Sequence, residues 1–374
     1  MSITHPTRRQ LIAATSAAAV LGFGICGAAH SASPASPLRL RLIGETRLPH
    51  RLRFKNTSVG GLSGIDFDAA TGTYYLISDD GGGISAPRFY TAQIAVGADR
   101  LGDVELTGVT FLQGLHAPDP EAIRWHAPSQ SLLWTSEGNA VRGVAPGLQQ
   151  MRPDGSLVRS SALPGMFDFG LLQGSRINKT LEGLAVSPDS RTAWVAMESP
   201  LLQDGPVSTV QDAGGSCRFT LIDLTSNHLS TALRQIAYQP DAIPRAPMPS
   251  SANGDNGVVE ILMLDAHRML VLERAYMAGL GDRQRNSLRL YAIDTRLATD
   301  TLNIAALTSS NHQPVVKTLV ADFASFPALA RLDNTEGMCW GPMLPGGSRT
   351  LLFVSDDNFN PLQITQLLAF EFLQ

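Results

Sequence analysis

One short pattern recurs along this chain: an acidic residue, a short apolar strand, a tight turn, and a second strand that ends in another acidic residue. The clearest copy lies at residues 179–200, KTLEGLAVSPDSRTAWVAMESP, where Glu182 precedes the first strand and Glu198 follows the second. The turn between them, Ser187–Ser190, contains proline and aspartate, which favour a tight reversal of the chain. Because the strands of a hairpin are antiparallel, the start of the first lies beside the end of the second. The pattern therefore predicts that the two glutamates lie close together at the open end of a β-hairpin.

Four other stretches repeat this pattern, with variations in the turn and in the opening residue. Their opening and closing residues are, in chain order, Ser63 with Asp79 and Asp80, Glu121 with Glu137, Glu260 with Glu273, and Glu336 with Asp356 and Asp357. Five copies of one strand–turn–strand unit indicate a closed repeat fold. We therefore predict an all-β fold, a β-propeller of five to six four-stranded blades.

The two ends of the domain are expected to close the ring. Residues 38–47, LRLRLIGETR, alternate apolar and polar side chains, as a strand with one solvated face does. Residues 364–372 are the last predicted strand, and pairing between these two segments would join the ends of the ring. A sixth blade could lie in residues 201–257, or both termini could assemble it. Within that stretch, residues 240–257 are rich in Pro, Ser, Asn and Gly and are predicted to be a long loop.

The N-terminal segment has the pattern of an export signal. Arg8 and Arg9 precede a soft apolar run at residues 11–29, and Ala32 is a suitable cleavage position. The arginine pair resembles a twin-arginine signal, although an ordinary secretory signal or an uncleaved anchor would share this composition. We expect a periplasmic or secreted protein. The predicted organisation is a twin-arginine signal peptide at residues 1–32, a linker at 33–37 and a propeller domain at 38–374.

The composition excludes several classes of protein. The sequence has 29 Lys and Arg against 33 Asp and Glu with no basic cluster, so nucleic acid is not an expected partner. After the signal, no apolar run is long enough to span a bilayer. We expect a monomer that acts on a small, anionic phosphoester. Cys217 and Cys339 could pair in an oxidising compartment, but the strand context of Cys339 favours two separate buried thiols.

The acidic ends of the hairpins predict a metal site. Equivalent positions of successive propeller blades lie at one depth of the central channel, so these acids are expected to share one mouth of that channel. Many carboxylates in one place raise one another's pKa or require a cation, and calcium is the cation that clustered oxygen ligands suit. For any single acid, an ion pair or a capped turn is the alternative. The predicted calcium ligands are Asp79, Asp80, Glu121, Glu137, Glu198, Glu260, Glu273, Asp356 and Asp357, with Asn334 and Asn358 completing the shell.

Basic residues flank the acidic ends of several repeats. Arg88, Arg176 and Lys179 are predicted to bind an anionic substrate, because guanidinium and ammonium groups hold phosphate oxygens. Arg274 directly follows Glu273, so its side chain is expected on the opposite face of the strand. A salt bridge to the neighbouring acid is the alternative for each of these basic residues.

Several of these motifs together resemble one family. The stretches GLSGIDFDAATGTYYLISDDGG, RFYTAQI, GSRINKTLEGLAVSPDSRTAWVAMESPL, LVLERAY, DNTEGMCWGP and SDDNF, in this order, resemble the phytase-like propeller family, which is named for an esterase-like activity. The resemblance implies a β-propeller, export, and hydrolysis of phosphoesters with calcium; related propeller phytases act on inositol phosphates. By matching motif, it implies the site residues Asp79, Asp80, Arg88, Glu121, Glu182, Glu198, Glu273, Arg274, Glu336, Asp356 and Asp357.

The leading hypothesis is an exported, metal-dependent hydrolase of phosphoric esters with a carboxylate rim at the propeller mouth. In this hypothesis Glu182, Glu336 and Arg274 take part in catalysis, while the other basic residues named above orient the substrate. One alternative is a lactonase or carboxylic-ester hydrolase with a central calcium ion. Another is a non-catalytic periplasmic binding propeller.

Overall fold

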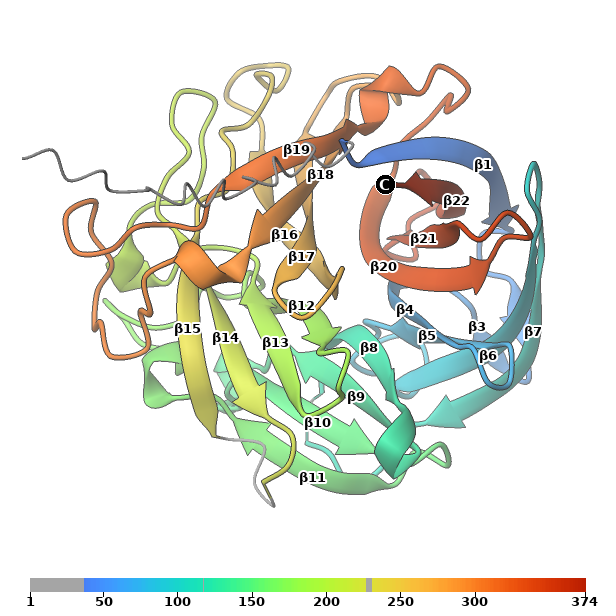
Figure 1. The fold of residues 1–374 in the computed structure, drawn as a ribbon, viewed down its shortest axis with the longest axis horizontal. Coiled ribbons are helices and arrows are strands. Elements are labelled where there is room, and N and C mark those ends of the chain that lie inside the picture. Colours follow the sequence, from blue (N-terminus) through green and yellow to red (C-terminus); the bar gives the residue numbers. More distant parts are fainter. Residues whose placement is uncertain (1–36, 117, 227–230) are drawn as a thin grey trace, which may run out of the picture. The chain divides into compact units, whose positions relative to one another are not determined.

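Five four-stranded antiparallel sheets follow one another around a ring in the described part of this computed structural model, residues 37–116, 118–226 and 231–374 (Figure 1). Each sheet is one blade, so the prediction of an all-β propeller is confirmed with five blades. The described residues contain no helix that is long and apolar enough to cross a membrane. The predicted signal peptide, residues 1–32, and all but the last residue of the predicted linker lie outside the described residues.

Blades 1 to 4 each consist of four consecutive strands. Blade 1 contains β4 (Leu62–Asp68), β5 (Thr73–Ser78), β6 (Arg88–Val96) and β7 (Leu101–Phe111). Blade 2 contains β8 (Pro120–His126), β9 (Ser131–Ser136), β10 (Gly147–Met151) and β11 (Leu157–Ala162). Blade 3 contains β12 (Leu181–Val186), β13 (Thr192–Met197), β14 (Cys217–Asp223) and β15 (Ala232–Tyr238). Blade 4 contains β16 (Gly254–Met263), β17 (Arg268–Met277), β18 (Asn286–Asp294) and β19 (Lys317–Asp322).

Blade 5 takes strands from both ends of the domain. It consists of β20 (Asn334–Met343), β21 (Arg349–Asp356), β22 (Thr365–Leu373) and, outermost, β1 (Arg39–Leu48). Strand β1 pairs with β22 along its whole length, with one bulge after Leu42. This pairing covers a strand edge that would otherwise be open. The ring is therefore closed by the two terminal strands, as predicted.

The described residues contain no sixth blade. Residues 201–257 supply β14 and β15 to blade 3 and the start of β16 to blade 4, so the predicted loop ends at residue 253 and not at 257. The remaining elements are short. They are the pair β2 (Arg53–Phe54) and β3 (Thr57–Ser58), and the 3₁₀ turns η1 (Ala127–Ser129), η2 (Ala140–Arg142), η3 (Gly165–Phe167), η4 (Leu202–Asp204), η5 (Thr295–Leu297) and η6 (Phe323–Ser325).

Apolar side chains fill the space between neighbouring blades. One buried cluster, which includes Leu184, Trp194 and Phe219, extends from blade 3 into blades 2 and 4. Cys217 belongs to this cluster, whereas Cys339 belongs to a different one between blades 5 and 1. Both thiols are free and buried. The expectation of two separate buried thiols is thus confirmed.

Candidate functional site

A cavity of about 770 Å³ lies at the end of the channel where the first strand of each blade begins and the second strand ends. Residues from all five blades line it, so the predicted meeting of the hairpin ends is observed. Its lining is strongly charged. The acidic residues are Asp79, Asp119, Glu121, Glu137, Glu182, Glu198, Asp255, Glu336 and Asp356, and the basic residues are Lys179, Arg274 and Arg285.

A β-bulge in each inner hairpin leaves the opening residue unpaired and changes the direction of its side chain. In blade 3, Leu181 pairs with Met197 and Gly183 pairs with Ala196, so Glu182 has no partner in the ladder. The other four blades have an equivalent bulge. A bulge bends the strand and redirects the extra side chain. The unpaired residues, from blade 1 to blade 5, are Ser63, Glu121 with Ala122, Glu182, Val259 and Glu336.

The same strand pairing determines which residue occupies the closing position of each hairpin. In blade 3, Met197 pairs with the residue just before the bulge, and Glu198 is the next residue along the chain. This closing position lies at the mouth of the channel in every blade. It is occupied, from blade 1 to blade 5, by Asp79, Glu137, Glu198, Arg274 and Asp356, and all five line the cavity.

Blade 4 is shifted by one residue relative to the sequence prediction, which placed Glu260 in the opening position. Val259 is the unpaired residue, because Val258 and Glu260 both have partners in β17. Glu260 does not line the cavity. Its Oε2 atom lies 2.7 Å from the guanidinium of Arg124, and its Oε1 atom accepts a hydrogen bond from the backbone N–H of Leu184 at 2.9 Å. Its position is that of a buried structural ion pair.

Because of the same shift, Glu273 lies outside the cavity lining and the next residue, Arg274, lies within it. Glu273 pairs within the ladder and lies outside the cavity lining, where it accepts hydrogen bonds from the Tyr238 hydroxyl (2.6 Å), the Lys317 ammonium (2.6 Å) and the Asn256 amide (2.8 Å). Arg274 follows it and lines the cavity. Blade 4 therefore presents a cation at the position where the other four blades present an acid.

The second acid of each Asp–Asp pair binds neighbouring loops and not the cavity. Asp80 accepts hydrogen bonds from three backbone N–H groups of the loop that follows it, and it forms a buried ion pair with Arg88 at 2.8 Å. Asp357 accepts a hydrogen bond from the N–H of Gly61 at 3.0 Å and lies 3.3 Å from the His50 ring. These contacts match the structural alternative for Asp80, Arg88 and Asp357.

Of the three predicted substrate-binding cations, only Lys179 lines the cavity. Arg176 donates hydrogen bonds to two backbone carbonyls, at 3.0 and 2.7 Å, outside the lining. The Lys179 ammonium lies 3.0 Å from Asp255 and 3.3 Å from Glu198. Lys179 therefore lines the cavity, but its ammonium is paired with two carboxylates, as in the salt-bridge alternative.

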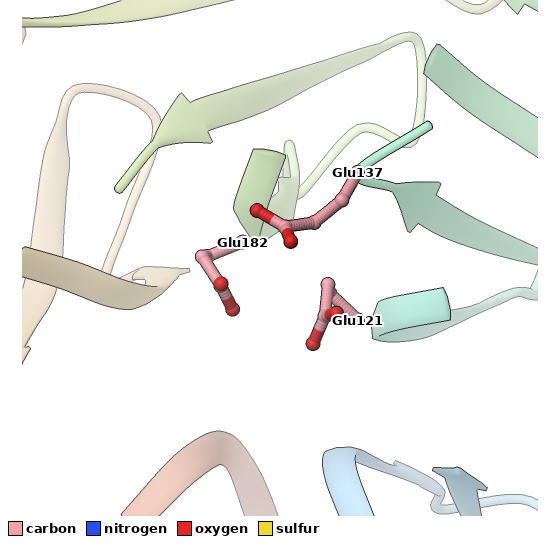
Figure 2. Close-up of side chains that lie close together, drawn as sticks. All are labelled: Glu121, Glu137 and Glu182. Atoms are coloured by element: carbon pink, nitrogen blue, oxygen red, sulfur yellow. The ribbon is translucent and has the colours of Figure 1, made fainter. Parts of the chain in front are cut away.

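The carboxylates of Glu121, Glu137 and Glu182 lie close together (Figure 2). One oxygen from each lies within 4.8 Å of the others. Burial, followed by the neighbouring carboxylates, raises the pKa of Glu121 and Glu182 well above the usual range. Burial also raises the pKa of Glu137 to about 8, although the N–H of Thr180 donates a hydrogen bond to it at 2.6 Å. Among the described residues, the Glu121 and Glu182 carboxylates have no hydrogen-bond donor.

A second acidic group comes from blades 5 and 1. The amide of Asn334 donates hydrogen bonds to Glu336 at 2.8 Å and to Asp356 at 3.1 Å. Burial and the charge of Asp356 raise the pKa of Glu336 to about 8, and burial raises the pKa of Asp356 to about 7. Burial, then the charges of Asp356 and Glu336, raise the pKa of Asp79 well above its usual range.

Arg274 lies beside the second acidic group and beside Glu198. Its guanidinium lies 3.7 Å from Glu198 and 3.6 Å from Glu336. Burial by itself would lower the pKa of Arg274, but Asp255 and these two glutamates raise it overall, so the side chain remains charged. Its buried Nε atom has no hydrogen-bond partner in the described part of the chain. This N–H is therefore an unpaired donor, although the atom itself has no exposed surface in the cavity.

Sequence reasoning missed several polar residues of the lining. Asp119 precedes Glu121 by two residues, and Asp255 lies in the stretch that was predicted to be a loop. Burial raises the pKa of Asp119, whereas Arg274 and Lys179 lower that of Asp255 against the effect of burial. An acidic residue within two positions of the first residue of an inner strand is the signal that would have identified both.

These features define a five-bladed propeller with a carboxylate-rich pocket at one end of its channel. The donors of the Glu121, Glu137 and Glu182 group are hard oxygens on separate elements, which matches the flexible oxygen coordination of calcium. The buried carboxylates without donors fit the same ion. The chain belongs to the Phytase-like family, described as "Esterase-like activity of phytase", whose model matches residues 57–359. That description indicates a hydrolase with esterase-like activity.

The comparison with curated proteins gave no match. Among solved structures, the chain is similar to Kuenenia stuttgartiensis hydrazine synthase (12% identity, 83% of this chain and 82% of that chain, TM-score 0.35). It is also similar to a luciferin-regenerating enzyme (10% identity, 83% and 92%, TM-score 0.38) and to Kluyveromyces lactis Hsv2 (10% identity, 69% and 60%, TM-score 0.30). At these TM-scores, the three structures give no information about the function of this chain.

Proposed function

We propose that this protein is an exported, calcium-dependent hydrolase of phosphoric esters. The observation that supports this most is the convergence of Glu121, Glu137 and Glu182, buried carboxylates whose oxygens lie within 4.8 Å of one another. Such a group is stable only when protons or a cation neutralise it. The esterase-like description of the family supports hydrolysis as the reaction class, and the arginine pair near the N-terminus supports export.

Glu121, Glu137 and Glu182 are the proposed calcium ligands. Calcium takes about six to eight oxygen ligands, so other carboxylates of the lining and water would complete its shell. When bound, the ion would polarise a phosphate oxygen and make a bound water more acidic.

The side chains of the opposite wall would orient the substrate and accept a proton. Lys179 and Arg274 offer an ammonium and a guanidinium to the phosphate oxygens. The pKa of Glu336, about 8, suits proton exchange near neutral pH. Its Oε1 atom accepts the hydrogen bond from Asn334, so its Oε2 atom is the one that would receive the proton.

Replacing Glu182 tests the proposal directly. Glu182→Gln keeps the size of the side chain and removes one charge, so we expect calcium affinity to fall by about 100-fold, since affinity follows the number of charged ligands. Hydrolysis of an aryl phosphate should be lost at the same calcium concentration. Calorimetric titration of chelator-stripped protein and a colorimetric assay measure the two effects.

The control is Glu105→Gln, an exposed glutamate on β7 in an outer strand, which should change neither quantity. Full hydrolysis by the stripped protein, or unchanged calcium binding by the Glu182 variant, would contradict the proposal.

A carboxylic-ester or lactone hydrolase is the second candidate, favoured by the esterase-like description of the family. A panel of aryl phosphates, aryl acetates and lactones separates the two. Turnover confined to the acetates or lactones would support this candidate. No turnover on any member, with thermal stabilisation by one of them, would support a binding propeller.

A further inference from the structure

We propose that Ser216 and His312 form a second site, which hydrolyses small, uncharged carboxylic esters and needs no metal ion. The site lies in a cavity of about 420 Å³ beside blade 3, and no described residue lines both this cavity and the one at the mouth of the channel. The inference goes beyond the proposed function, because it assigns a different reaction to a different place.

The hydroxyl of Ser216 lies within reach of a base. Ser216 directly precedes β14 and lines the cavity. Its Oγ atom lies 3.5 Å from Nε2 of His312 and donates a hydrogen bond to Oε1 of Gln239 at 3.2 Å. A contact between a nucleophile and its base is often this long until a substrate binds. A rotation of the hydroxyl from Gln239 to His312 would direct its proton to the imidazole.

The neighbouring amide fixes the form of the imidazole that can accept this proton. Oδ1 of Asn311 lies 3.2 Å from Nδ1 of His312 and also accepts a hydrogen bond from the N–H of Thr308 at 2.9 Å. The amide nitrogen of Asn311 donates to the carbonyl of Ala306 at 2.9 Å, so the amide cannot be turned over without losing both bonds. Because Oδ1 only accepts, Nδ1 carries the hydrogen, and Nε2 of the neutral ring is left as the acceptor facing Ser216.

Close backbone packing holds the serine in place. Gly214 has a φ of +77°, and a Cβ atom on Gly215 would lie 2.2 Å from the carbonyl oxygen of Asp204. Neither position has room for a side chain. The amide of Gln239 donates to three backbone carbonyls of the same turn, at 3.1 to 3.3 Å. The turn before Ser216 is therefore fixed from both sides.

A buried ion pair anchors the segment that carries His312. This segment, residues 295–316, joins β18 to β19. Arg218 of β14 lies 2.6 Å from Asp204 and donates to three backbone carbonyls of the segment. Asp204 also accepts a hydrogen bond from the N–H of Leu307 at 2.8 Å. Nucleophile and base are thus both attached to blade 3, which is the rigid support that a catalytic pair requires.

The lining of this cavity suits a neutral ester. Pro206, Leu307 and Pro314 supply apolar contacts, and no lysine or arginine is among the described residues that line it. A phosphate group would therefore find no cation there, whereas an ester carbonyl needs only a hydrogen-bond donor. Ser309 lines the cavity, and its hydroxyl has no partner among the described residues. This hydroxyl can donate to the carbonyl oxygen as negative charge develops on it.

The reaction proceeds in two balanced halves. Oγ of Ser216 bonds to the carbonyl carbon while its proton moves to Nε2 of His312, and the alcohol leaves with that proton. Water then attacks the acyl-serine and gives a proton to Nε2, and this proton returns to Ser216 as the carboxylic acid is released. The net change consumes one ester and one water, with no change of oxidation state.

The test uses the whole purified protein after metal has been removed with a chelator. Hydrolysis of p-nitrophenyl acetate is followed by absorbance, and a fluorophosphonate, which bonds to an activated serine with loss of fluoride, is located by peptide mass spectrometry. We expect ester hydrolysis and a label on Ser216. Ser216→Ala should remove the label, and both Ser216→Ala and His312→Gln should lower kcat/KM by at least about 100-fold. Ser310→Ala, an exposed serine of the same segment outside the lining, should change neither quantity.

A further variant tests the positioning role of Asn311. Asn311→Ala should lower kcat about tenfold and leave KM unchanged, because Asn311 acts on the ring of His312 and does not line the cavity. Equal changes in kcat and KM would contradict this role. Thermal unfolding and calcium titration of Ser216→Ala should match the unaltered protein, which shows that the fold and the mouth of the channel are intact.

The outcomes separate this inference from the proposed function. Ester hydrolysis that requires calcium would place the reaction at the mouth of the channel and overturn the second site. A label on another residue, or full activity of Ser216→Ala, would overturn it as well. Metal-independent hydrolysis that is lost in Ser216→Ala would support the second site, even if the cavity at the mouth proves to hydrolyse no phosphoester.

Discussion

At the scale of single residues, Arg274 places a positive charge on one wall of an otherwise acidic cavity. The closing position carries an acid in four blades and an arginine in blade 4. A guanidinium held 3.6 Å from Glu336 and 3.7 Å from Glu198 offsets their mutual repulsion. It also turns one wall of an acidic pocket into a surface for an anion. The chemistry of the site thus depends on a single arginine at a hairpin position that is acidic in the other four blades.

Replacing Arg274 should separate phosphate binding from calcium binding. In Arg274→Met we expect the affinity for inorganic phosphate to fall by about 2–5 kcal/mol, because truncating one partner of a buried charge pair costs that much. Calcium affinity should be retained or increased, since a positive charge is removed from the cavity. Calorimetric titrations of the two ions measure both effects.

Arg285→Met is the matched control, since this half-buried arginine pairs with Asp282 at the mouth. A smaller loss of phosphate affinity is expected there. Equal losses in the two variants would show that Arg274 has no special position.

At the scale of secondary-structure elements, one buried ion pair joins four inner strands. Arg124 on β8 donates hydrogen bonds to the carbonyls of Ile65 on β4 and Ile261 on β16. Its partner, Glu260 on β16, accepts a hydrogen bond from Leu184 on β12. The pair lies within the ring of inner strands and outside the cavity lining. Its role is to hold the strands, and hence the walls of the cavity, in fixed positions.

Breaking this pair should destabilise the fold. Arg124→Met leaves a buried carboxylate without its partner, which costs about 3–5 kcal/mol, and Glu260→Leu leaves a buried guanidinium at a similar cost. The double variant Arg124→Met with Glu260→Leu should be less destabilised than the sum of the two. Urea unfolding at constant calcium measures the three free energies. Additive losses would mean that the two side chains do not stabilise each other.

At the scale of the whole molecule, the ring determines the ionisation of the cavity. Acids from all five blades line one cavity because the inner hairpins stand in a ring, which β1 closes through β22. In the unfolded chain the same acids are far apart and titrate near their ordinary pKa values of about 4. The stability of the protein is therefore linked to pH and to any cation that neutralises the group.

The metal-free protein should lose stability as pH rises. A carboxyl group whose pKa is raised by folding stabilises the fold fully below its unfolded pKa, and this contribution is lost as pH rises through the folded pKa. The relevant folded pKa values are about 7 for Asp356 and about 8 for Glu137 and Glu336. Thermal unfolding with a chelator should show a Tm that falls between about pH 5 and pH 9, and calcium should reverse this fall. A Tm that rises over this range, or that does not respond to calcium, would contradict the predicted loss of stability.

The repeat in the sequence was enough to predict the propeller and much of the site. Alternating apolar residues, turns and flanking acids are local features, so they predict hairpins whose ends carry Glu182 with Glu198, Glu121 with Glu137, and Glu336 with Asp356. The strand at residues 38–47 and its pairing with the last strand followed from the same pattern. The export signal and the bound calcium stay predictions.

Only the tertiary structure decided which acid of each pair enters the cavity. The shift in blade 4 makes Val259 the residue of the bulge and leaves Glu260 and Glu273 outside the lining. Hydrogen bonds to backbone groups likewise hold three other predicted site residues, namely Asp80, Asp357 and Arg176. The physical reason is the period of a strand: a change of one residue in pairing turns a side chain to the opposite face. The sequence determined that acids gather at the hairpin ends, but the pairing between strands determined where each one points.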